Sequence, residues 1–325
     1  MSRREQLAHL KHPVLSIVGP TASGKSSLAI AVAQKLNAEI VSADSMQIYR
    51  FMDIGTAKVD LEKTSIKHYG IDIIDPGQAY SAQLFQDYAR DAFLEINQKD
   101  KVPLLCGGTG FYVQAALEDM QFPSGKQTDN PLRDYYQAYA ESHGPDELWQ
   151  LLKEKDPVSA EVIHPHNVRR VIRALEMYEE GISYAEQAKN IRNLPAAVPS
   201  VRFGLRVDPD VLARRINTRV DQMIEQGLVE EVQDLMQKGF KEALTAPQAI
   251  GYKEIVAYLE GQLSLEDATD QIKTATRRYA KRQRSWFKRD SSLIWLEATH
   301  VNQDELVDDV ISLYRHHCSE SNTLS

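Results

Sequence analysis

The chain is poor in the features that mark secreted, membrane and zinc proteins. Its 325 residues include only two cysteines, Cys106 and Cys318, too few for a disulfide framework or a cysteine-rich zinc site. No apolar run approaches the roughly 20 residues that cross a bilayer. The first dozen residues are polar and basic, and no signal-peptide core follows them. We therefore expect a cytoplasmic protein with reduced thiols, no zinc and no membrane association.

An excess of positive charge is also absent, which argues at first against a nucleic-acid partner. Lys and Arg number 38 against 46 Asp and Glu, giving a net charge of −8. The positive charge is segregated, however, because residues 271–289 contain eight Lys or Arg and no Asp or Glu, with three aromatic residues interleaved. Smaller basic groups lie at 169–173 and 214–219. Such clusters suit a phosphate backbone, although each could equally be a solvated helix face.

What the sequence does contain is a complete phosphate-binding loop of the pattern G-x-x-x-x-G-K-[ST]. Its residues are Gly19, Pro20, Thr21, Ala22, Ser23, Gly24, Lys25 and Ser26. An apolar, β-branched run precedes the loop at 14–18 and a helical pattern follows it, so backbone N–H groups at the helix N-terminus would converge on a di- or triphosphate. Lys25 supplies a positive charge for the phosphate oxygens, and Ser26 supplies a hydroxyl for Mg²⁺.

Short β-rich runs alternate with helical patterns along much of the chain. The runs lie at 14–18, 39–42, 71–74, 102–106, 201–207 and 292–296, with helical patterns that include 81–97 and 110–117. This alternation predicts an α/β fold with a P-loop NTPase-like core, in which helices flank a parallel sheet. Ligands of such sheets bind beyond the carboxyl ends of the strands, where polar residues follow the predicted strands at 19–26, Asp44, Asp75 and 107–110.

Residues 118–199 predict a separate helical insertion domain. Helical patterns at 131–142 and 167–180 lie between loop-like stretches at 119–130 and 190–200. The core would then comprise 1–117 and 200–325, with a helical C-terminal part that binds RNA. We expect the polar final ten residues to be disordered. We find no dimerisation stripe, and therefore expect a monomer without an obligate protein partner.

Five further motifs follow the phosphate loop in order. They read DSMQIYR at 44–50, MDIGTAK at 52–58, GGTGFY at 107–112, RALE at 173–176 and QAIGYKE at 248–254. Each motif is weak alone, but the ordered set closely resembles the bacterial tRNA dimethylallyltransferases, also called tRNA isopentenyltransferases. The resemblance runs from about residue 13 to about residue 297.

The resemblance implies a prenyl transfer reaction. The dimethylallyl group of dimethylallyl diphosphate would move to N6 of the adenine directly 3′ of the anticodon, in tRNAs that read codons beginning with U. The products would be N6-isopentenyladenosine and diphosphate. The phosphate loop would then hold an isoprenoid diphosphate rather than ATP, which requires no change in its physics because the loop recognises phosphate charge.

The resemblance also implies catalytic roles, which the chemistry makes reasonable. Asp44 matches the general base that would orient the adenine amine and accept its proton; the alternatives are a helix cap or a second-shell carboxylate for Mg²⁺. Thr109 matches a donor to the bridging oxygen of the diphosphate, and Arg219 matches an arginine that reaches the diphosphate. With Lys25, these groups would stabilise the negative charge that develops as diphosphate leaves. Thr109 could otherwise be a turn residue, and Arg219 a surface charge.

A tRNA acceptor would have to present its adenine outside the base stack, which single-stranded loops allow at low cost. By resemblance, several segments would contact the anticodon stem–loop. The predicted contact residues are Asp44, Ser45, Met46, Gln47, Thr109, Arg133, Arg169, Arg170, Val171, Ile172, Arg173, Ala249, Ile250, Gly251, Tyr252, Lys253 and Glu254.

Some positions depart from the family pattern, and other functions stay open. Phe51 stands where glycine is usual, and Ser26 where threonine is common. A small-molecule P-loop kinase or NTPase would use the same phosphate loop. An adenylate isopentenyltransferase would not need the insertion or the basic segment at 271–289. A non-catalytic RNA-binding module would not need the intact loop with Asp44 and Thr109.

Overall fold

The computed structural model describes residues 1–122, 130–191, 194–238, 240 and 245–323. The chain divides into two compact units. The larger unit comprises Met1–Leu117 together with Ala197–Ser325, and the smaller unit comprises Glu118–Ala196. Each unit has its own hydrophobic core.

The larger unit is built on a parallel sheet, as the alternating pattern predicts. Over the described residues the sheet has six strands in the order β3-β2-β4-β1-β5-β6, and every neighbouring pair is parallel. The strands are β1 (Val14–Val18), β2 (Ala38–Ser42), β3 (His68–Tyr69), β4 (Val102–Gly107), β5 (Ser200–Arg206) and β6 (Leu293–Glu297). Strands β1, β2 and β4 are buried throughout, which is why the sequence shows apolar runs rather than alternation.

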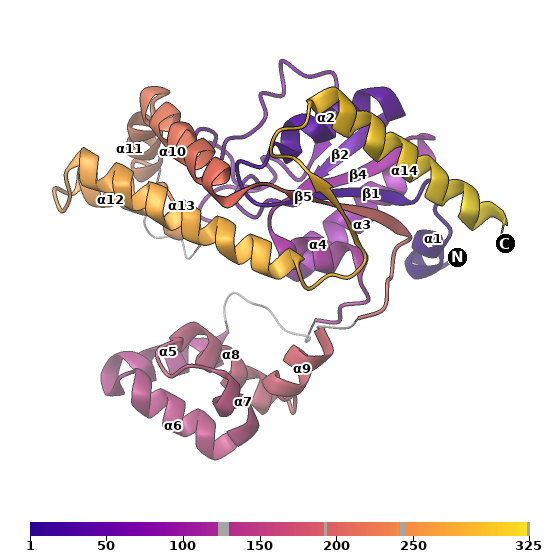
Figure 1. Cartoon of the computed structure of the whole chain (residues 1–325). Coiled ribbons are helices and arrows are strands. Elements are labelled where there is room, and N and C mark those ends of the chain that lie inside the picture. The colour runs from indigo at the N-terminus through magenta and orange to yellow at the C-terminus, as the bar shows by residue number, and fades with distance from the viewer. Residues whose placement is uncertain (123–129, 192–193, 239, 241–244, 324–325) are drawn as a thin grey trace. The chain divides into compact units, whose positions relative to one another are not determined.

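Helices cover both faces of this sheet (Figure 1). One face carries α2 (Lys25–Leu36) and α14 (Gln303–Thr323), and the other carries α1 (Arg3–Ala8), α3 (Ala82–Gln98) and α4 (Gly110–Leu117). Four further helices form a second helical layer at one end of the sheet, with α10 and α12 both packed against α13. They are α10 (Pro209–Glu225), α11 (Leu228–Met236), α12 (Tyr252–Leu259) and α13 (Leu265–Phe287).

Two local predictions are wrong. Residues 71–74 form no strand, because β3 ends at Tyr69 and the next residue, Gly70, takes a left-handed φ of 78° against the backbone of Ser42. The C-terminal residues are not disordered up to Thr323, since they extend α14. That helix is anchored by buried residues that include Val307 and Val310. Residues 324–325 lie outside the described part of the chain.

The smaller unit is a helical bundle, and its described residues contain no strand beyond one isolated bridge between Glu118 and Ala196. Its helices are α5 (Pro131–His143), α6 (Pro145–Lys155), α7 (Pro157–Val162), α8 (Val168–Glu179) and α9 (Tyr184–Asn190). Proline occupies the first position of α5, α6 and α7, where its missing N–H has no intrahelical acceptor to lose. The core is formed by apolar faces of α5, α6, α7 and α8.

Candidate active site

The strand order brings together three loops that the sequence places far apart. Strands β2, β4 and β1 are neighbours, and their carboxyl ends lead into Asp44, Thr109 and the phosphate loop. The loops approach closely: the Thr109 N–H donates to the Ala43 carbonyl at 3.1 Å. A Cβ on Gly107 would lie 2.3 Å from the same carbonyl oxygen. Glycine at 107 is therefore required by backbone packing between β2 and β4.

The phosphate loop has the backbone needed to present converging N–H groups. Ala22 and Gly24 take left-handed φ values of 61° and 90°, and Gly24 is the N-cap of α2, so Lys25 and Ser26 begin the helix. The Lys25 ammonium contacts the Pro20 carbonyl at 3.3 Å. Burial lowers the pKa of Lys25, against the opposing effect of nearby Asp44. An anion bound in the loop would offset that burial cost.

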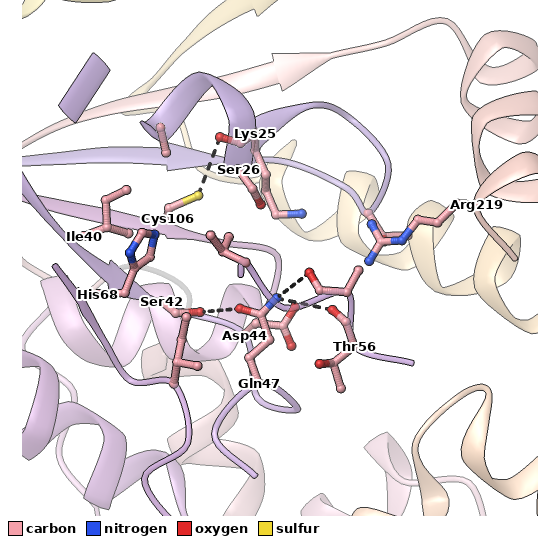
Figure 2. A pocket seen from close by; sticks show the side chains of 16 residues that line it. Lys25, Ser26, Ile40, Ser42, Asp44, Gln47, Thr56, His68, Cys106 and Arg219 are labelled. Carbon is pink, nitrogen blue, oxygen red and sulfur yellow. Dashed lines mark hydrogen bonds between the residues drawn. The ribbon is translucent and has the colours of Figure 1, made fainter. Parts of the chain in front are cut away.

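The loops enclose adjoining cavities that share Thr21, Lys25, Asp44, Thr56 and Arg219. The larger is about 300 Å³, and the smaller is about 50 Å³. Figure 2 shows the smaller cavity, with Lys25, Ser26, Asp44 and Arg219 around a common space. Two cations, Lys25 and Arg219, and one carboxylate, Asp44, therefore come from separate elements to line the same cavities. A small anion that carries an apolar group could bind there.

Arg219 reaches this cavity from the middle of α10. Burial lowers the pKa of its guanidinium, and the Asp44 carboxylate opposes that effect. Arg214, on the same helix, is exposed. Arg219 therefore lines the cavity beside Lys25 and Asp44, and its contact with a diphosphate stays a prediction.

Asp44 and Thr109 occupy neighbouring turns. Asp44 Oδ1 accepts a hydrogen bond from the Met46 N–H at 3.0 Å. Thr109 Oγ1 accepts from the Ser45 N–H at 3.0 Å and lies 3.3 Å from the Ser45 hydroxyl, to which it donates. The Thr109 hydroxyl can donate to a substrate oxygen after rotating away from Ser45.

Gln47 is held in one orientation. Its Nε2 donates to the carbonyls of Thr56 and Ala57 at 3.3 and 3.4 Å, and its Oε1 accepts from the Ser42 hydroxyl at 2.9 Å (Figure 2). The amide donors are thus engaged within the protein. What Gln47 offers a base edge is chiefly the remaining acceptor capacity of Oε1.

Gln283 is a site residue that no sequence motif indicates. Its Oε1 accepts from the Thr21 N–H at 2.9 Å, and its Nε2 donates to the Gly108 carbonyl at 2.8 Å. One buried side chain of α13 thereby ties the phosphate loop to the turn that carries Thr109. The available signal was an uncharged polar residue in the middle of the basic segment. Tyr279, one turn earlier, interacts with both Thr109 and Gln283, and burial raises its pKa to about 12.

The basic segment of α13 divides between two environments. Arg282 lines the larger of the two cavities around Lys25 and Asp44, the one of about 300 Å³. Four other cations line a groove of about 410 Å³ between α10 and α13; they are Arg277, Lys281, Arg284 and Lys288. Arg277 also donates to Asn217 at 2.6 Å, and Lys273 pairs with Asp221 at 2.7 Å. Part of the positive charge therefore serves helix packing.

In the smaller unit, Glu176 organises two of the predicted tRNA-binding arginines. Its buried carboxylate pairs with Arg133 at 2.7 Å and with Arg173 at 3.1 Å. Arg169 and Arg170 are exposed. Val171 and Ile172 are buried in the core of this unit, so the prediction that their side chains contact tRNA is wrong.

Replacing Glu176 should destabilise the smaller unit. Glu176→Ala leaves two adjacent guanidinium groups without their shared carboxylate. Because both arginines are about a third exposed, we expect a loss of about 2 kcal/mol, below the range for fully buried pairs. Chemical denaturation of the whole chain measures the change. The exposed Glu161→Ala in α7 is the control, and an equal effect of both variants would contradict the buried role of Glu176.

The 249–254 segment also needs correction. Ala249, Tyr252 and Glu254 are buried, and the Glu254 carboxylate accepts from the Gly251 N–H at 2.8 Å, capping α12. The Glu254 side chain is therefore a helix cap rather than a tRNA contact. Ala249 and Tyr252, although buried, line the larger cavity together with Ile250 and Gly251, so contact with tRNA at these four positions stays a prediction. Lys253 is exposed.

The two cysteines are unsuited to nucleophilic catalysis. Both cysteines are free. Burial raises the pKa of Cys106 to about 11, so this cavity-lining thiol is a poor nucleophile at neutral pH.

Across the described ranges, no helix is long and apolar enough to span a membrane. Nor do those ranges contain a group of three or more His, Cys, Asp or Glu that could hold a metal ion.

Comparison with known proteins identifies the family. The family model described as IPP transferase matches residues 47–290, and a model described as isopentenyl transferase matches residues 12–66. The chain is 45% identical over 311 residues to the tRNA dimethylallyltransferase of Carboxydothermus hydrogenoformans, covering 93% of this chain and 97% of that protein. It is 44% identical to that of Thermoanaerobacter sp., covering 92% and 96%.

Solved structures agree. The crystal structure of the full-length tRNA isopentenylpyrophosphate transferase from Bacillus halodurans matches with a TM-score of 0.73 and 39% identity, covering 97% of this chain and 99% of that one. A structure of a eukaryotic dimethylallyltransferase acting on tRNA matches with a TM-score of 0.73 and 31% identity, covering 89% and 75%. The chain therefore belongs to the bacterial tRNA dimethylallyltransferase family of prenyltransferase enzymes, whose P-loop NTPase-like core it shares.

Proposed function

We propose that this enzyme transfers the dimethylallyl group of dimethylallyl diphosphate to N6 of the adenine 3′ of the anticodon, in tRNAs that read codons beginning with U. The observation that carries the proposal is the shared cavity of Lys25, Asp44 and Arg219, with Thr109 on the neighbouring turn. A kinase would need the phosphate loop. It has no equal need for a carboxylate beside an apolar wall that includes Ile216, Val220 and Met223.

The diphosphate would lie in the phosphate loop. Lys25 and Arg219 would contact its oxygens, and the N–H groups at the start of α2 would add hydrogen bonds. The donor set also fits Mg²⁺, which keeps several waters and binds through one or two protein oxygens plus substrate phosphates. The Ser26 hydroxyl would hold the ion, and the Asp44 carboxylate lines the same cavity. When bound, the ion would neutralise charge on the diphosphate.

Transfer would then proceed by displacement at the dimethylallyl carbon. The bond from that carbon to the bridging oxygen breaks, and the bond to adenine N6 forms. The N6 proton passes to the Asp44 carboxylate, and diphosphate leaves with the bonding electrons. Lys25, Arg219 and the rotated Thr109 hydroxyl would stabilise the charge that builds on the departing oxygens.

The smaller unit would bind tRNA through exposed arginines, and Arg169 provides the test. Arg169→Ala should weaken stem–loop binding, because one phosphate contact is lost. The slope of log K against log salt concentration should become less steep by about 1, and turnover at saturating stem–loop should be nearly unchanged. Binding is measured at several salt concentrations. The exposed Lys189→Ala of the same unit is the control. An unchanged salt slope for Arg169→Ala would contradict its role in phosphate binding.

The proposed reaction is tested by label transfer from dimethylallyl diphosphate, with Mg²⁺ and without ATP. The acceptors are an unmodified anticodon stem–loop carrying adenine 3′ of the anticodon, the same stem–loop with that adenine replaced, and AMP. Label on the first acceptor alone supports the proposal. Label on AMP would favour an adenylate isopentenyltransferase. No label on any acceptor, together with ATP consumption in a parallel incubation that contains ATP, would favour a small-molecule kinase.

A further inference from the structure

Glu231, on α11, contacts the loop at 53–57 through an unusual number of hydrogen bonds. Its Oε2 accepts from the N–H groups of Asp53 and Ile54 at 2.9 and 2.7 Å. Its Oε1 accepts from the Gly55 N–H at 3.2 Å and from the Tyr252 hydroxyl at 2.6 Å. A single carboxylate therefore satisfies three consecutive backbone donors and one buried hydroxyl.

The loop that Glu231 holds forms part of the site. Gly55 and Thr56 line the larger cavity. The carbonyls of Thr56 and Ala57 accept the two hydrogen bonds that orient the Gln47 amide. Gln47 lies three residues after Asp44, on the turn that Asp44 begins. A hydrogen-bonded chain thus runs from Glu231 through the loop to Gln47.

Tyr252 makes this arrangement compact. A Cβ on Gly55 would lie 2.5 Å from the Tyr252 ring, so the ring requires glycine there. Burial and the adjacent Glu231 carboxylate raise the pKa of Tyr252, and its hydroxyl remains a donor at neutral pH. The buried Tyr252 side chain thereby packs against Gly55 and donates to Glu231.

The far end of the loop has an independent anchor. The Lys58 ammonium contacts the Tyr49 carbonyl at 2.6 Å, and the carboxylates of Asp53 and Asp72 at 2.6 and 2.5 Å. Losing Glu231 therefore leaves the N–H groups of residues 53–55 without their shared acceptor, while Lys58 still ties Asp53 to Tyr49 and Asp72 and closes the loop. The expected consequence is a local displacement rather than unfolding of the site.

We propose that Glu231 is a positioning residue for the acceptor nucleotide, which it never touches: it fixes the 53–57 loop, and this loop fixes Gln47 beside Asp44. The inference rests on the proposed function. It predicts that Glu231 affects use of the RNA acceptor more than binding of the diphosphate donor, because the phosphate loop is held separately by Gln283.

The first test compares Glu231→Gln and Glu231→Ala with Asp234→Asn, an exposed carboxylate on the same helix. A misplacement of about 1 Å can cost about 100-fold in rate, so for Glu231→Ala we expect kcat/KM for the stem–loop to fall about 10- to 100-fold. The KM for dimethylallyl diphosphate should change less than about twofold, since the proposed diphosphate contacts, Lys25 and Arg219, lie outside the 53–57 loop. Equal falls in kcat/KM for the stem–loop and for dimethylallyl diphosphate would overturn the proposal.

A double-mutant cycle with Gln47→Ala separates positioning from general stability. If Glu231 acts through Gln47, the double variant should lose little more than the more damaging single variant. Additive losses would overturn the proposed hydrogen-bonded chain from Glu231 to Gln47.

Tyr252→Phe is a milder variant, because it removes only one of the four hydrogen bonds to Glu231. It serves if Glu231→Ala folds poorly. Its kcat/KM should fall for the stem–loop and not for the donor, and an equal fall for both substrates would count against the proposal.

Hydrogen exchange supplies a readout that does not depend on transfer. Glu231→Gln should speed exchange of the 53–55 amides and leave the amides of α2 unchanged. Unchanged protection at 53–55 would overturn the inference even if activity fell. A wild-type enzyme that transfers no label would instead contradict the proposed function, and the exchange result would still decide whether Glu231 holds the loop.

Discussion

Asp44→Asn should lower the rate of dimethylallyl transfer about 10²- to 10⁴-fold, the usual contribution of a positioned general base. Asparagine keeps the shape of the side chain and one acceptor oxygen, so the turn that Asp44 makes with the Met46 N–H is preserved. It cannot accept the N6 proton. Binding of the stem–loop should change only a few-fold. Single-turnover transfer and equilibrium binding measure the two quantities.

Asp75→Asn is the control for this result. Asp75 lies on the chain that follows β3 and makes an exposed pair with Arg50 at 2.9 Å, outside the residues that line either cavity around Lys25. Exposed pairs contribute little, so its removal should leave transfer within about twofold. Near-normal turnover of Asp44→Asn would show that another group accepts the proton.

Arg219→Ala should lower kcat/KM for dimethylallyl diphosphate about 10²- to 10³-fold, the range seen when one donor to developing negative charge is removed. The partly buried guanidinium faces the cavity together with Lys25 and Asp44. Arg219→Lys should recover part of the loss, since lysine retains the charge without the planar fork. Steady-state kinetics with varied donor concentration measure the effect.

Arg214→Ala provides the matched control for Arg219. Both arginines lie on α10, but Arg214 is exposed. Its loss should leave donor kinetics unchanged. If Arg219→Ala instead altered only the KM for the stem–loop, Arg219 would belong to the RNA surface and its assignment to the diphosphate would be wrong.

These two variants separate the two halves of the reaction. Asp44 would act on the proton of the incoming amine, and Arg219 on the charge of the leaving diphosphate. The groups are nevertheless electrostatically linked, because the Asp44 carboxylate raises the pKa of both Lys25 and Arg219 against the effect of burial. We therefore expect the double variant to lose less than the sum of the single losses.

Much of the larger unit follows from local sequence. The phosphate loop is a short segment whose glycine and lysine positions are set by its own backbone geometry and by the helix that follows. Strands such as Val14–Val18 are buried on both faces, so they leave continuous apolar runs. Helix α4 begins and ends where its pattern predicts. The ordered motifs were sufficient to indicate the family before any contact between them was known.

The tertiary structure decided which of these motif residues face the site. Val171 and Ile172 are predicted tRNA contacts and Glu254 belongs to the QAIGYKE motif, yet all three side chains are buried. The last turns of α14 look polar in sequence but extend a helix whose earlier turns are anchored in the core. β3 ends before Gly70 because this residue takes a left-handed φ, and the nearby Ser42 backbone leaves room there only for glycine.

The sequence alone determined the chemistry that is present: a phosphate loop, a carboxylate after the second strand, and segregated basic charge. Only the tertiary structure decided how these groups are held, through Gln283 joining two loops and Glu231 fixing a third. The physical reason is sequence separation. Local motifs are encoded by neighbouring residues, whereas a side chain more than 170 residues away gains its role when strand order and helix packing bring it within hydrogen-bond distance.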